Sequence, residues 1–212
     1  MLSPRRFDGT PDVEVTAVEA SPALIVFVAS EGAFGPAPDL VLSGINHGPN
    51  TGNAILHSGT VGAALTGAGL GAMAVALSVD SPRPEHWETA AAVARRAIEW
   101  AASRGVPGVV LNVNAADLPL SEVRGLRAAP LAAFGAVQAE LDRRDQHHFT
   151  VTFTQIRRGE AEISEAERTD AGLLRRGWVT ATAVRASFEP AEIDIEALTC
   201  AGEDLDPMPG SA

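Results

Sequence analysis

The stretch Pro38-Asp-Leu-Val-Leu-Ser-Gly-Ile-Asn-His-Gly-Pro-Asn-Thr-Gly-Asn-Ala-Ile-Leu-His-Ser-Gly-Thr-Val-Gly-Ala-Ala-Leu-Thr66 decides the fold and carries the candidate site. Its residues Asp39 to Leu42 predict a short buried strand, which a loop rich in glycine and asparagine follows. The small residues over about 58–68 then predict a helix that opens at Ser58-Gly59-Thr60. In α/β proteins this arrangement presents backbone N–H groups and small polar side chains to an anion at the carboxyl end of a strand.

The loop also offers amide oxygens of the kind that bind hard metal ions, from Asn46, Asn50 and Asn53. No Asp or Glu lies between Val41 and Val79, so a metal site here needs carboxylates from elsewhere in the fold. Simpler interpretations stay open. Asparagine tolerates left-handed loop geometry, and Ser58 and Thr60 are also ordinary residues for the start of a helix.

Strands and helices alternate on both sides of this stretch. The pattern predicts a strand over 13–18 and a helix over 23–30, with Ser21 as N-cap and Pro22 at its first position. A continuous apolar run predicts a strand over 72–78 that is covered on both faces of the sheet. An amphipathic helix is predicted over 86–103, and a third buried strand over 109–113. This order implies parallel pairing with right-handed crossovers, and therefore an α/β fold.

The alternating pattern of strands and helices ends after Asn114. Residues 115–168 predict an appendage with a β-hairpin that includes Phe149–Gln155 and serves contacts between copies. Asp170 is expected to cap a short helix, and a strand is expected over 178–184. A last helix over 193–200 and a disordered acidic tail over 201–212 would complete a single domain spanning 1–200.

Composition excludes several function classes. A net charge of −11 argues against nucleic-acid polymers and anionic membranes as partners. All 16 basic residues are arginine, so a P-loop lysine and Schiff-base chemistry are excluded. A single cysteine, Cys200, cannot form an internal disulfide, and no signal peptide or membrane-length apolar run is found, so we expect a cytoplasmic protein.

Other motifs suggest chemistry less strongly. Ser58 lacks the preceding glycine of a hydrolase nucleophile elbow, since position 56 is Leu. The glycines of Gly67-Ala-Gly-Leu-Gly71 follow a helix, so they are expected to end that helix rather than bind a dinucleotide. His57 could approach a leaving group, but packing is the favoured interpretation. His147 and His148 are expected to form a surface pair.

The motifs Pro38-Asp-Leu-Val-Leu-Ser-Gly-Ile-Asn46, Gly48-Pro-Asn50 and Ser58-Gly-Thr-Val61 resemble the SurE family of metal-dependent nucleotidases. Weaker likenesses extend the resemblance over about residues 17–185. They lie at Ala20-Ser-Pro-Ala-Leu-Ile-Val26, Leu111-Asn-Val-Asn114, Thr169-Asp170 and Gly177-Trp-Val-Thr-Ala-Thr182. The resemblance implies a Rossmann-like three-layer fold with a mainly parallel sheet.

The resemblance also implies an activity. It points to hydrolysis of nucleoside 5′- and 3′-monophosphates with a divalent metal ion, Mg²⁺ or Mn²⁺, by a homodimer or homotetramer. Asn46 then corresponds to the family's metal-ligand asparagine. Asn50, Ser58, Gly59 and Thr60 correspond to positions that line the phosphate site.

The chain departs from the family pattern in one large respect. The family begins with a strand that ends in Asn-Asp-Asp-Gly, whose two aspartates bind the metal, and this sequence has no counterpart. The catalytic residues are therefore unknown at this level. We expect a fragment or a misassigned start, because a missing first strand leaves sheet edges unpaired. The alternative is a catalytically inactive nucleotide-binding, phosphate-binding or oligomerising module.

Overall fold

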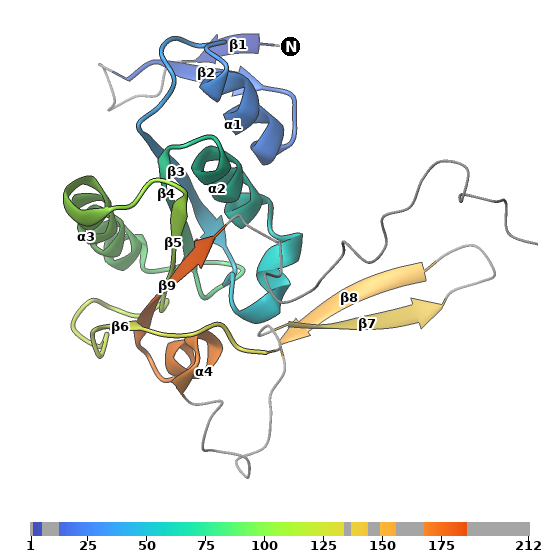
Figure 1. Cartoon of the computed structure of the whole chain (residues 1–212). Coiled ribbons are helices and arrows are strands. Elements are labelled where there is room, and N and C mark those ends of the chain that lie inside the picture. Colours follow the sequence, from blue (N-terminus) through green and yellow to red (C-terminus); the bar gives the residue numbers. More distant parts are fainter. Residues whose placement is uncertain (1, 6–12, 134–136, 144–148, 156–167, 186–212) are drawn as a thin grey trace, which may run out of the picture.

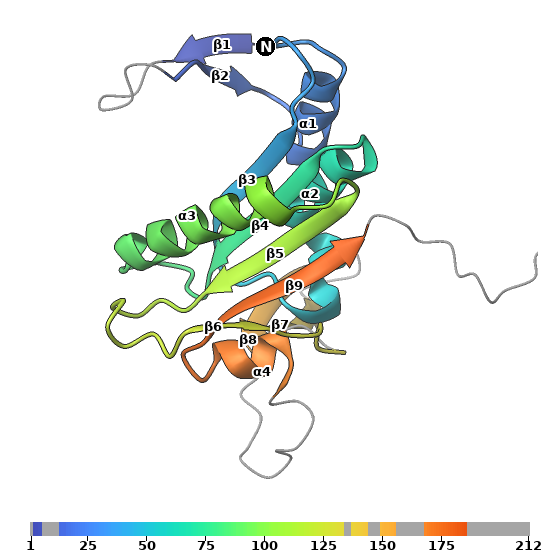
Figure 2. The same ribbon diagram turned by 60° about the vertical axis from the view of Figure 1, so that its left-hand side comes forward.

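The computed structural model describes residues 2–5, 13–133, 137–143, 149–155 and 168–185. Its main sheet has five strands, shown in Figures 1 and 2. In spatial order they are β3 (Leu40–His47), β4 (Met73–Val79), β5 (Val109–Ala115), β9 (Val179–Arg185) and β6 (Leu126–Ala128). Strands β3, β4 and β5 are parallel, β9 is antiparallel to β5, and β6 is parallel to β9.

Helices cover both faces of this sheet. Helix α2 (Gly59–Gly69) lies on one face and α3 (Trp87–Arg104) on the other (Figure 2). Side chains alternate along β4, so Ala74 and Ala76 join the core beneath α2, whereas Val75 and Leu77 join the core beneath α3. The predicted three-layer, Rossmann-like α/β fold with a mainly parallel sheet is therefore confirmed.

Smaller elements surround the three layers. Strand β1 (Leu2–Arg5) pairs antiparallel with β2 (Val15–Val18), and α1 (Pro22–Ser30) follows. A 3₁₀ helix, η1 (Gly52–His57), leads into α2, and α4 (Asp170–Leu174) precedes β9. Strands β7 (Val137–Arg143) and β8 (Phe149–Gln155) form the predicted antiparallel hairpin, which projects from the layers in Figure 1.

Several expected elements have different bounds. The strand expected over 39–42 continues to His47, with a register shift against β4 between Ser43 and Asn46, so Asn46 lies in a strand and not in the following loop. Residues 2–5 form a strand that the sequence pattern did not predict. Part of the region assigned to the appendage, β6, belongs to the main sheet.

The buried stripe of α3 also differs from the expected one. Helical spacing predicts an apolar face made of Trp87, Ala91, Ala94, Ile98 and Ala101. Of these, Ala101 is buried and Ala94 and Ile98 are half-buried, but Trp87 and Ala91 are exposed. The buried positions are Thr89, Ala90, Val93, Ala97 and Ala101. Small side chains let the helix approach the sheet closely, whereas the large Trp87 ring lies outside, 5.3 Å from the His47 ring.

Two glycines allow close approaches that a side chain would block. Gly44 has φ +124°, and a Cβ there would collide with the carbonyl oxygen of Leu77 in β4. Gly67 lies inside α2, where a Cβ would stand 2.6 Å from the Val41 side chain of β3. Gly67 therefore sets the spacing between helix and sheet. The helix ends at Gly69, with Leu70 as its C-cap and Gly71 at φ +96°, near the predicted end.

Some predictions fall outside the described residues. They concern His147, His148, Cys200, the helix over 193–200 and the acidic tail over 201–212. In the part of the chain that the structure describes, none of the helices combines the length and apolar character that spanning a bilayer requires.

Candidate functional site

The backbone of Asn50 is fixed by two buried asparagines at the end of β5. The Asn50 N–H donates to Asn114 Oδ1 at 2.7 Å. The Asn50 carbonyl oxygen accepts from Asn112 Nδ2 at 2.9 Å and from Asn114 Nδ2 at 3.0 Å. Both asparagine side chains are fully buried and two residues apart, so they lie on the same face of the strand. The loop after β3 is thereby attached to a strand more than 60 residues away.

The side chain of Asn50 is oriented by a third strand. Its Nδ2 donates to the hydroxyl of Ser78 in β4 at 2.6 Å. Ser78 is almost fully buried, so this bond is shielded from water. No described residue donates to the Oδ1 of the same amide. Asn50 is thus held at both backbone and side chain.

The side chain of Asn46 is oriented by its own chain neighbours and not by another strand. Its Nδ2 donates to the carbonyl oxygens of His47 and Gly48, each at 3.0 Å. Its Oδ1 accepts no hydrogen bond from a described residue. The residue sits just after the register shift in β3, opposite Ser78, so it belongs to the same end of the sheet as Asn50.

Helix η1 is held in place by the buried carboxylate of Asp170. The Gly52 N–H donates to Asp170 Oδ2 at 2.8 Å, and the N–H groups of Ala132 and Ala171 donate to Oδ1 at 2.9 and 2.7 Å. Asp170 was expected to be the N-cap of α4, but the cap is Thr169, whose hydroxyl accepts from the Gly172 N–H at 3.2 Å. The aspartate instead joins three separate backbone segments.

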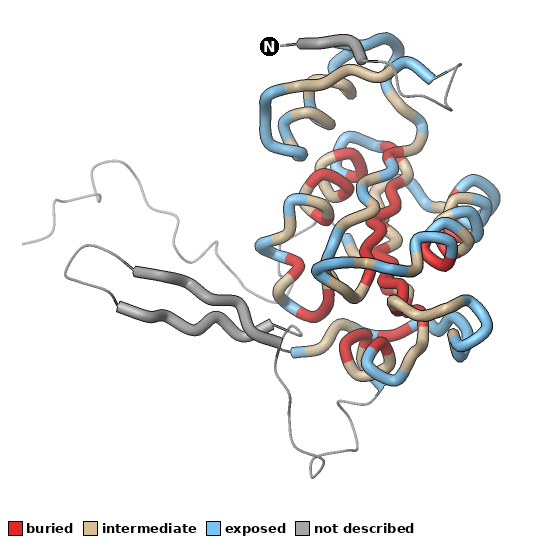
Figure 3. Tube along the Cα trace, turned by 180° about the vertical axis from the view of Figure 1, so that it is seen from behind, coloured by how far each residue is buried: buried red, intermediate tan, exposed pale blue. Residues whose placement is uncertain are grey.

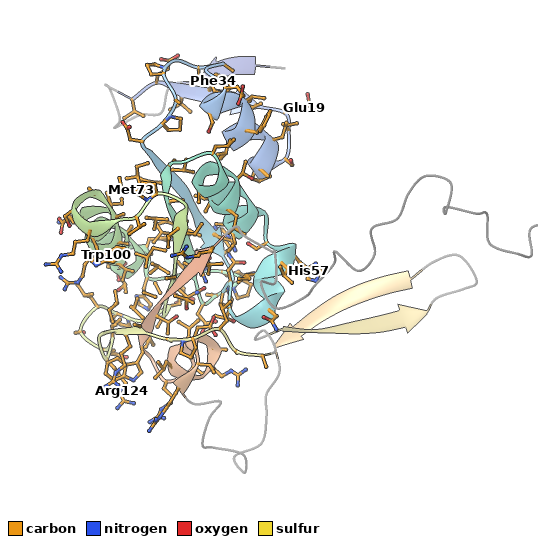
Figure 4. The ribbon with its side chains drawn as sticks, in the orientation of Figure 1. Glu19, Phe34, His57, Met73, Trp100 and Arg124 are labelled. Carbon is orange, nitrogen blue, oxygen red and sulfur yellow. The ribbon has the colours of Figure 1, made fainter. Side chains whose placement is uncertain are left out.

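Asn53 takes part in the same attachment of η1. Its Nδ2 donates to the Ala133 carbonyl at 2.8 Å, and its N–H donates to the Ala132 carbonyl at 3.2 Å. These bonds attach η1 to the segment that precedes the hairpin. His57, at the end of η1, is exposed and lies on the outer side of the helix (Figure 4).

The helix expected from Ser58 onward begins as predicted. Ser58 is the N-cap of α2, and its Oγ accepts from the Val61 N–H at 3.1 Å. The N–H groups of Gly59 and Thr60, in the first turn, have no hydrogen-bond partner among the described residues. Helix N-termini carry such unpaired donors together with the positive end of the helix dipole. Since α2 runs antiparallel to β3 and β4, this end lies at the carboxyl edge of the sheet.

The donor set fits a divalent metal ion only in part. Asn46 and Asn50 each present an amide oxygen with no described partner, and buried Asn112 Oδ1 also lacks one. Mg²⁺ and Mn²⁺ sites, however, are normally built on one or more carboxylates. No group of three or more His, Cys, Asp or Glu side chains that could hold a metal occurs within the described ranges. The described residues therefore do not complete a metal site.

Asp80 is the acidic residue that follows β4 at this edge, two positions after Ser78. Its N–H donates to the Ala115 carbonyl at 2.9 Å. Burial raises the pKa of the Asp80 carboxyl to about 6, Arg175 opposes the shift, and Asp117 adds to it. A carboxyl whose pKa lies near neutrality can exchange protons at physiological pH.

Four residues that shape this region, Ser78, Asp80, Asn112 and Asn114, were given no site role from the sequence, although Asn112 and Asn114 lie in one of the family-like motifs. Each lies at or just after the carboxyl end of a predicted parallel strand, and that position was the available signal. Two asparagines spaced by one residue in an otherwise apolar strand were a second signal. Their partner, the Asn50 backbone, could not be named without the fold.

Comparisons with known proteins agree with this architecture. The sequence model described as "Survival protein SurE" matches residues 2–136. A protein of Methylococcus capsulatus named 5'-nucleotidase SurE is 36% identical over 84% of this chain and 68% of its own length. A 5'/3'-nucleotidase SurE of Edwardsiella ictaluri is 31% identical over 92% of this chain and 73% of its own length.

A solved structure shows the same likeness in three dimensions. The crystal structure of the SurE protein from Aquifex aeolicus superposes with a TM-score of 0.73 at 26% identity, covering 93% of this chain and 79% of that one. The fold and the sequence both agree with this family. The chain belongs to the SurE family.

Proposed function

We propose that this chain is a phosphomonoesterase that hydrolyses nucleoside 5′- and 3′-monophosphates. Its family membership and the names of its relatives, 5'-nucleotidase SurE and 5'/3'-nucleotidase SurE, support this proposal. The observation that carries it is the start of α2, where two unpaired N–H groups and the Ser58 hydroxyl lie at the same edge of the sheet as Asn50.

In this proposal the phosphate group binds at the first turn of α2. The N–H groups of Gly59 and Thr60 donate to phosphate oxygens, and the helix dipole adds favourable charge. Ser58 Oγ accepts from the Val61 N–H, so its own proton remains available for donation to the phosphate. Asn50, fixed by β4 and β5, would orient the substrate on the opposite side.

A divalent metal ion, Mg²⁺ or Mn²⁺, belongs to the proposal as an expected cofactor with Asn46 as one neutral ligand. When bound, such an ion neutralises charge on phosphoryl oxygens. Because the described residues lack the accompanying carboxylates, we derive no catalytic step through it. We further propose a cytoplasmic homodimer or homotetramer in which the β7–β8 hairpin contributes contacts between copies.

Phosphate release from a nucleoside monophosphate tests the activity. We expect release with Mn²⁺ that stops on addition of a chelator. The variant Ser58→Ala should weaken substrate binding at least about tenfold, because it removes a hydrogen-bond donor to the phosphate at an estimated 1.5–3 kcal/mol. Ser21→Ala is the matched control, since Ser21 caps α1 in the same way through the Leu24 N–H. Equal effects of the two variants on binding would contradict a phosphate site at α2.

The incomplete metal set favours a second candidate function, binding of a nucleotide or phosphate without turnover. Such a module would melt at a higher temperature with a nucleoside monophosphate present, yet release no phosphate with any divalent ion. A ligand-dependent rise in Tm without product would therefore select this second function over the first.

A further inference from the structure

Two arginines and one tryptophan form a group beside β6 and the start of β9, which we call the Arg–Trp cluster. The guanidinium carbons of Arg124 and Arg127 lie 5.3 and 4.0 Å from the centroid of the Trp178 ring. All residues of the segment 120–128 except Val123 are exposed, so both arginines lie on the outer surface of the molecule (Figure 3). Figure 4 shows Arg124 well away from His57, so the cluster lies outside the candidate site at the start of α2.

The tryptophan ring of the cluster is fixed by the backbone around it. The Arg124 N–H donates to the Gly177 carbonyl at 2.9 Å, and the Val179 N–H donates to the Gly125 carbonyl at 2.9 Å. A Cβ at Gly125 would stand 3.2 Å from a carbon of the Trp178 ring, so the ring lies directly on that backbone. Attraction between the guanidinium groups and the ring then restricts the two arginine side chains. The cluster therefore keeps its shape without a ligand.

The positive charge of the cluster is not neutralised by the described part of the chain. Neither guanidinium forms an ion pair with a described carboxylate, although the net charge of the chain is −11. The two guanidinium carbons lie within about 10 Å of each other, the Debye length at 0.1 M salt, so the two charges repel. Arg175 differs, because its charge acts on the carboxylate of Asp80. The cluster is thus a local excess of positive charge on an acidic chain.

These features favour an anion that carries two negative charges. A guanidinium presents its N–H groups in a planar fork that matches the oxygens of a phosphate group. A dianion between Arg124 and Arg127 would relieve their repulsion, whereas a single chloride ion would balance only one of the two charges. A nucleobase fits poorly, because Gly125 and two guanidinium groups already contact the ring on which it would stack.

We propose that the Arg–Trp cluster binds a phosphate-type dianion, either inorganic phosphate or the phosphate group of a phosphomonoester. Arg124 and Arg127 donate hydrogen bonds to its oxygens, and Trp178 keeps both guanidinium groups in place. Both arginines are exposed to water, so we expect weak binding in the millimolar range. The proposal does not depend on the proposed hydrolysis, because it concerns a separate surface and needs no divalent ion.

NMR of the full ¹⁵N-labelled chain tests the proposal. The chain has three tryptophans and therefore three indole N–H signals, and the variants Trp178→Phe and Trp100→Phe identify two of them by their loss. Without divalent ions, inorganic phosphate and sulfate should each shift the Trp178 signal along a saturating curve. The Trp100 signal should stay in place. Sodium chloride at matched ionic strength should give no saturable shift of either signal.

A double variant of the two arginines tests which groups bind the anion. Arg124→Gln with Arg127→Gln should weaken phosphate binding at least about tenfold, because the charged hydrogen-bond donors are removed. Arg95→Gln with Arg96→Gln is the matched control, since these neighbouring arginines of α3 are exposed and the same charge is lost. Circular dichroism confirms that both double variants are folded. Equal binding by the two would overturn the proposal.

A nucleoside monophosphate and its parent nucleoside separate the two sources of the phosphate group. A shift of the Trp178 signal with the monophosphate, and none with the nucleoside, would show that a phosphomonoester binds through its phosphate. Binding of inorganic phosphate without binding of the monophosphate would assign the site to the free ion. No saturable shift with phosphate and sulfate, an equal shift with chloride, or a shift with the nucleoside alone would overturn the proposal. Phosphate release is measured separately, so either proposal can fail without the other.

Discussion

The carboxyl end of the main sheet contrasts with the edge formed by β3 and α1. The two regions differ in whether their polar backbone groups find hydrogen-bond partners within the chain. At the carboxyl end, an irregular stretch after β3 leads into the 3₁₀ helix η1, and buried side chains from β4, β5 and α4 bind the polar groups of Asn50 and Gly52. At the edge, β3 is a regular strand whose outer groups meet no described partner. A regular strand is therefore not always the region whose backbone groups have the most hydrogen-bond partners. Here the segment after β3 has more such partners than the outer side of β3.

The difference follows from where each region finds its partners. The loop relies on Asn112, Asn114 and Asp170, all fully buried, so its hydrogen bonds are shielded from competing water. The outer backbone groups of β3 have no such buried partner among the described residues. We therefore expect substitutions at the loop anchors to lower the stability of the folded chain more than substitutions of exposed residues in β3.

The largest effect is expected from Asp170→Ala. It leaves three N–H groups without an acceptor in a buried site, and each such group costs about 1–3 kcal/mol. Urea unfolding should show a loss of about 3–5 kcal/mol. Asp117→Ala is the comparison, because Asp117 also accepts backbone N–H groups, from Glu85 and His86, but near solvent. A loss for Asp117→Ala as large as that for Asp170→Ala would remove burial as the explanation.

Asp80→Asn should produce a pH-dependent change. The pKa of the Asp80 carboxyl is raised to about 6, so the fold favours its protonated form and loses stability as pH rises from about 4 to 6. The neutral asparagine does not share this loss. Between pH 4 and pH 7 the variant should therefore gain up to about 3 kcal/mol relative to the parent chain. The exposed Glu122→Gln serves as control, and a constant offset for Asp80→Asn at every pH would refute the burial argument.

Two glycines in α2 should respond to the same substitution with opposite signs. Gly67→Ala forces a methyl group against Val41 and should cost about 1–3 kcal/mol. Gly62→Ala meets nothing within 4 Å and should add about 0.5–1 kcal/mol through helix propensity. Thermal unfolding of both variants separates close packing from intrinsic propensity. A gain from Gly67→Ala would mean that α2 can move away from β3 at little cost.

Sequence patterns were sufficient for the central part of the fold. The continuous apolar run at 72–78 and the Ser58 cap predicted β4 and α2 almost to their bounds, because burial on both faces and N-capping leave local signals. The α3 stripe was misplaced because spacing alone cannot show whether large Trp87 or small Ala90 faces the sheet. The extension of β3 was missed because Ser43, Gly44 and Asn46 resemble loop residues.

The site was predictable in position but not in its connections. Asn46, Asn50 and Ser58 were marked by the spacing of the loop, and the structure brings them to one edge of the sheet. That Asp170 would bind Gly52 rather than cap α4 could not be foreseen, since the two residues are 118 positions apart. Such long-range contacts depend on the fold as a whole, which local patterns do not encode.

The Gly52–Asp170 bond has a consequence for the order of events during synthesis. A ribosome must add more than 100 residues after Gly52 before its hydrogen-bond acceptor exists. Contacts of such sequence separation close late, because the loop entropy must be overcome first. The growing chain would therefore form α2 and the neighbouring strands well before the loop that precedes them takes its final shape. The Gly52 amide would then exchange with solvent only when the whole domain opens.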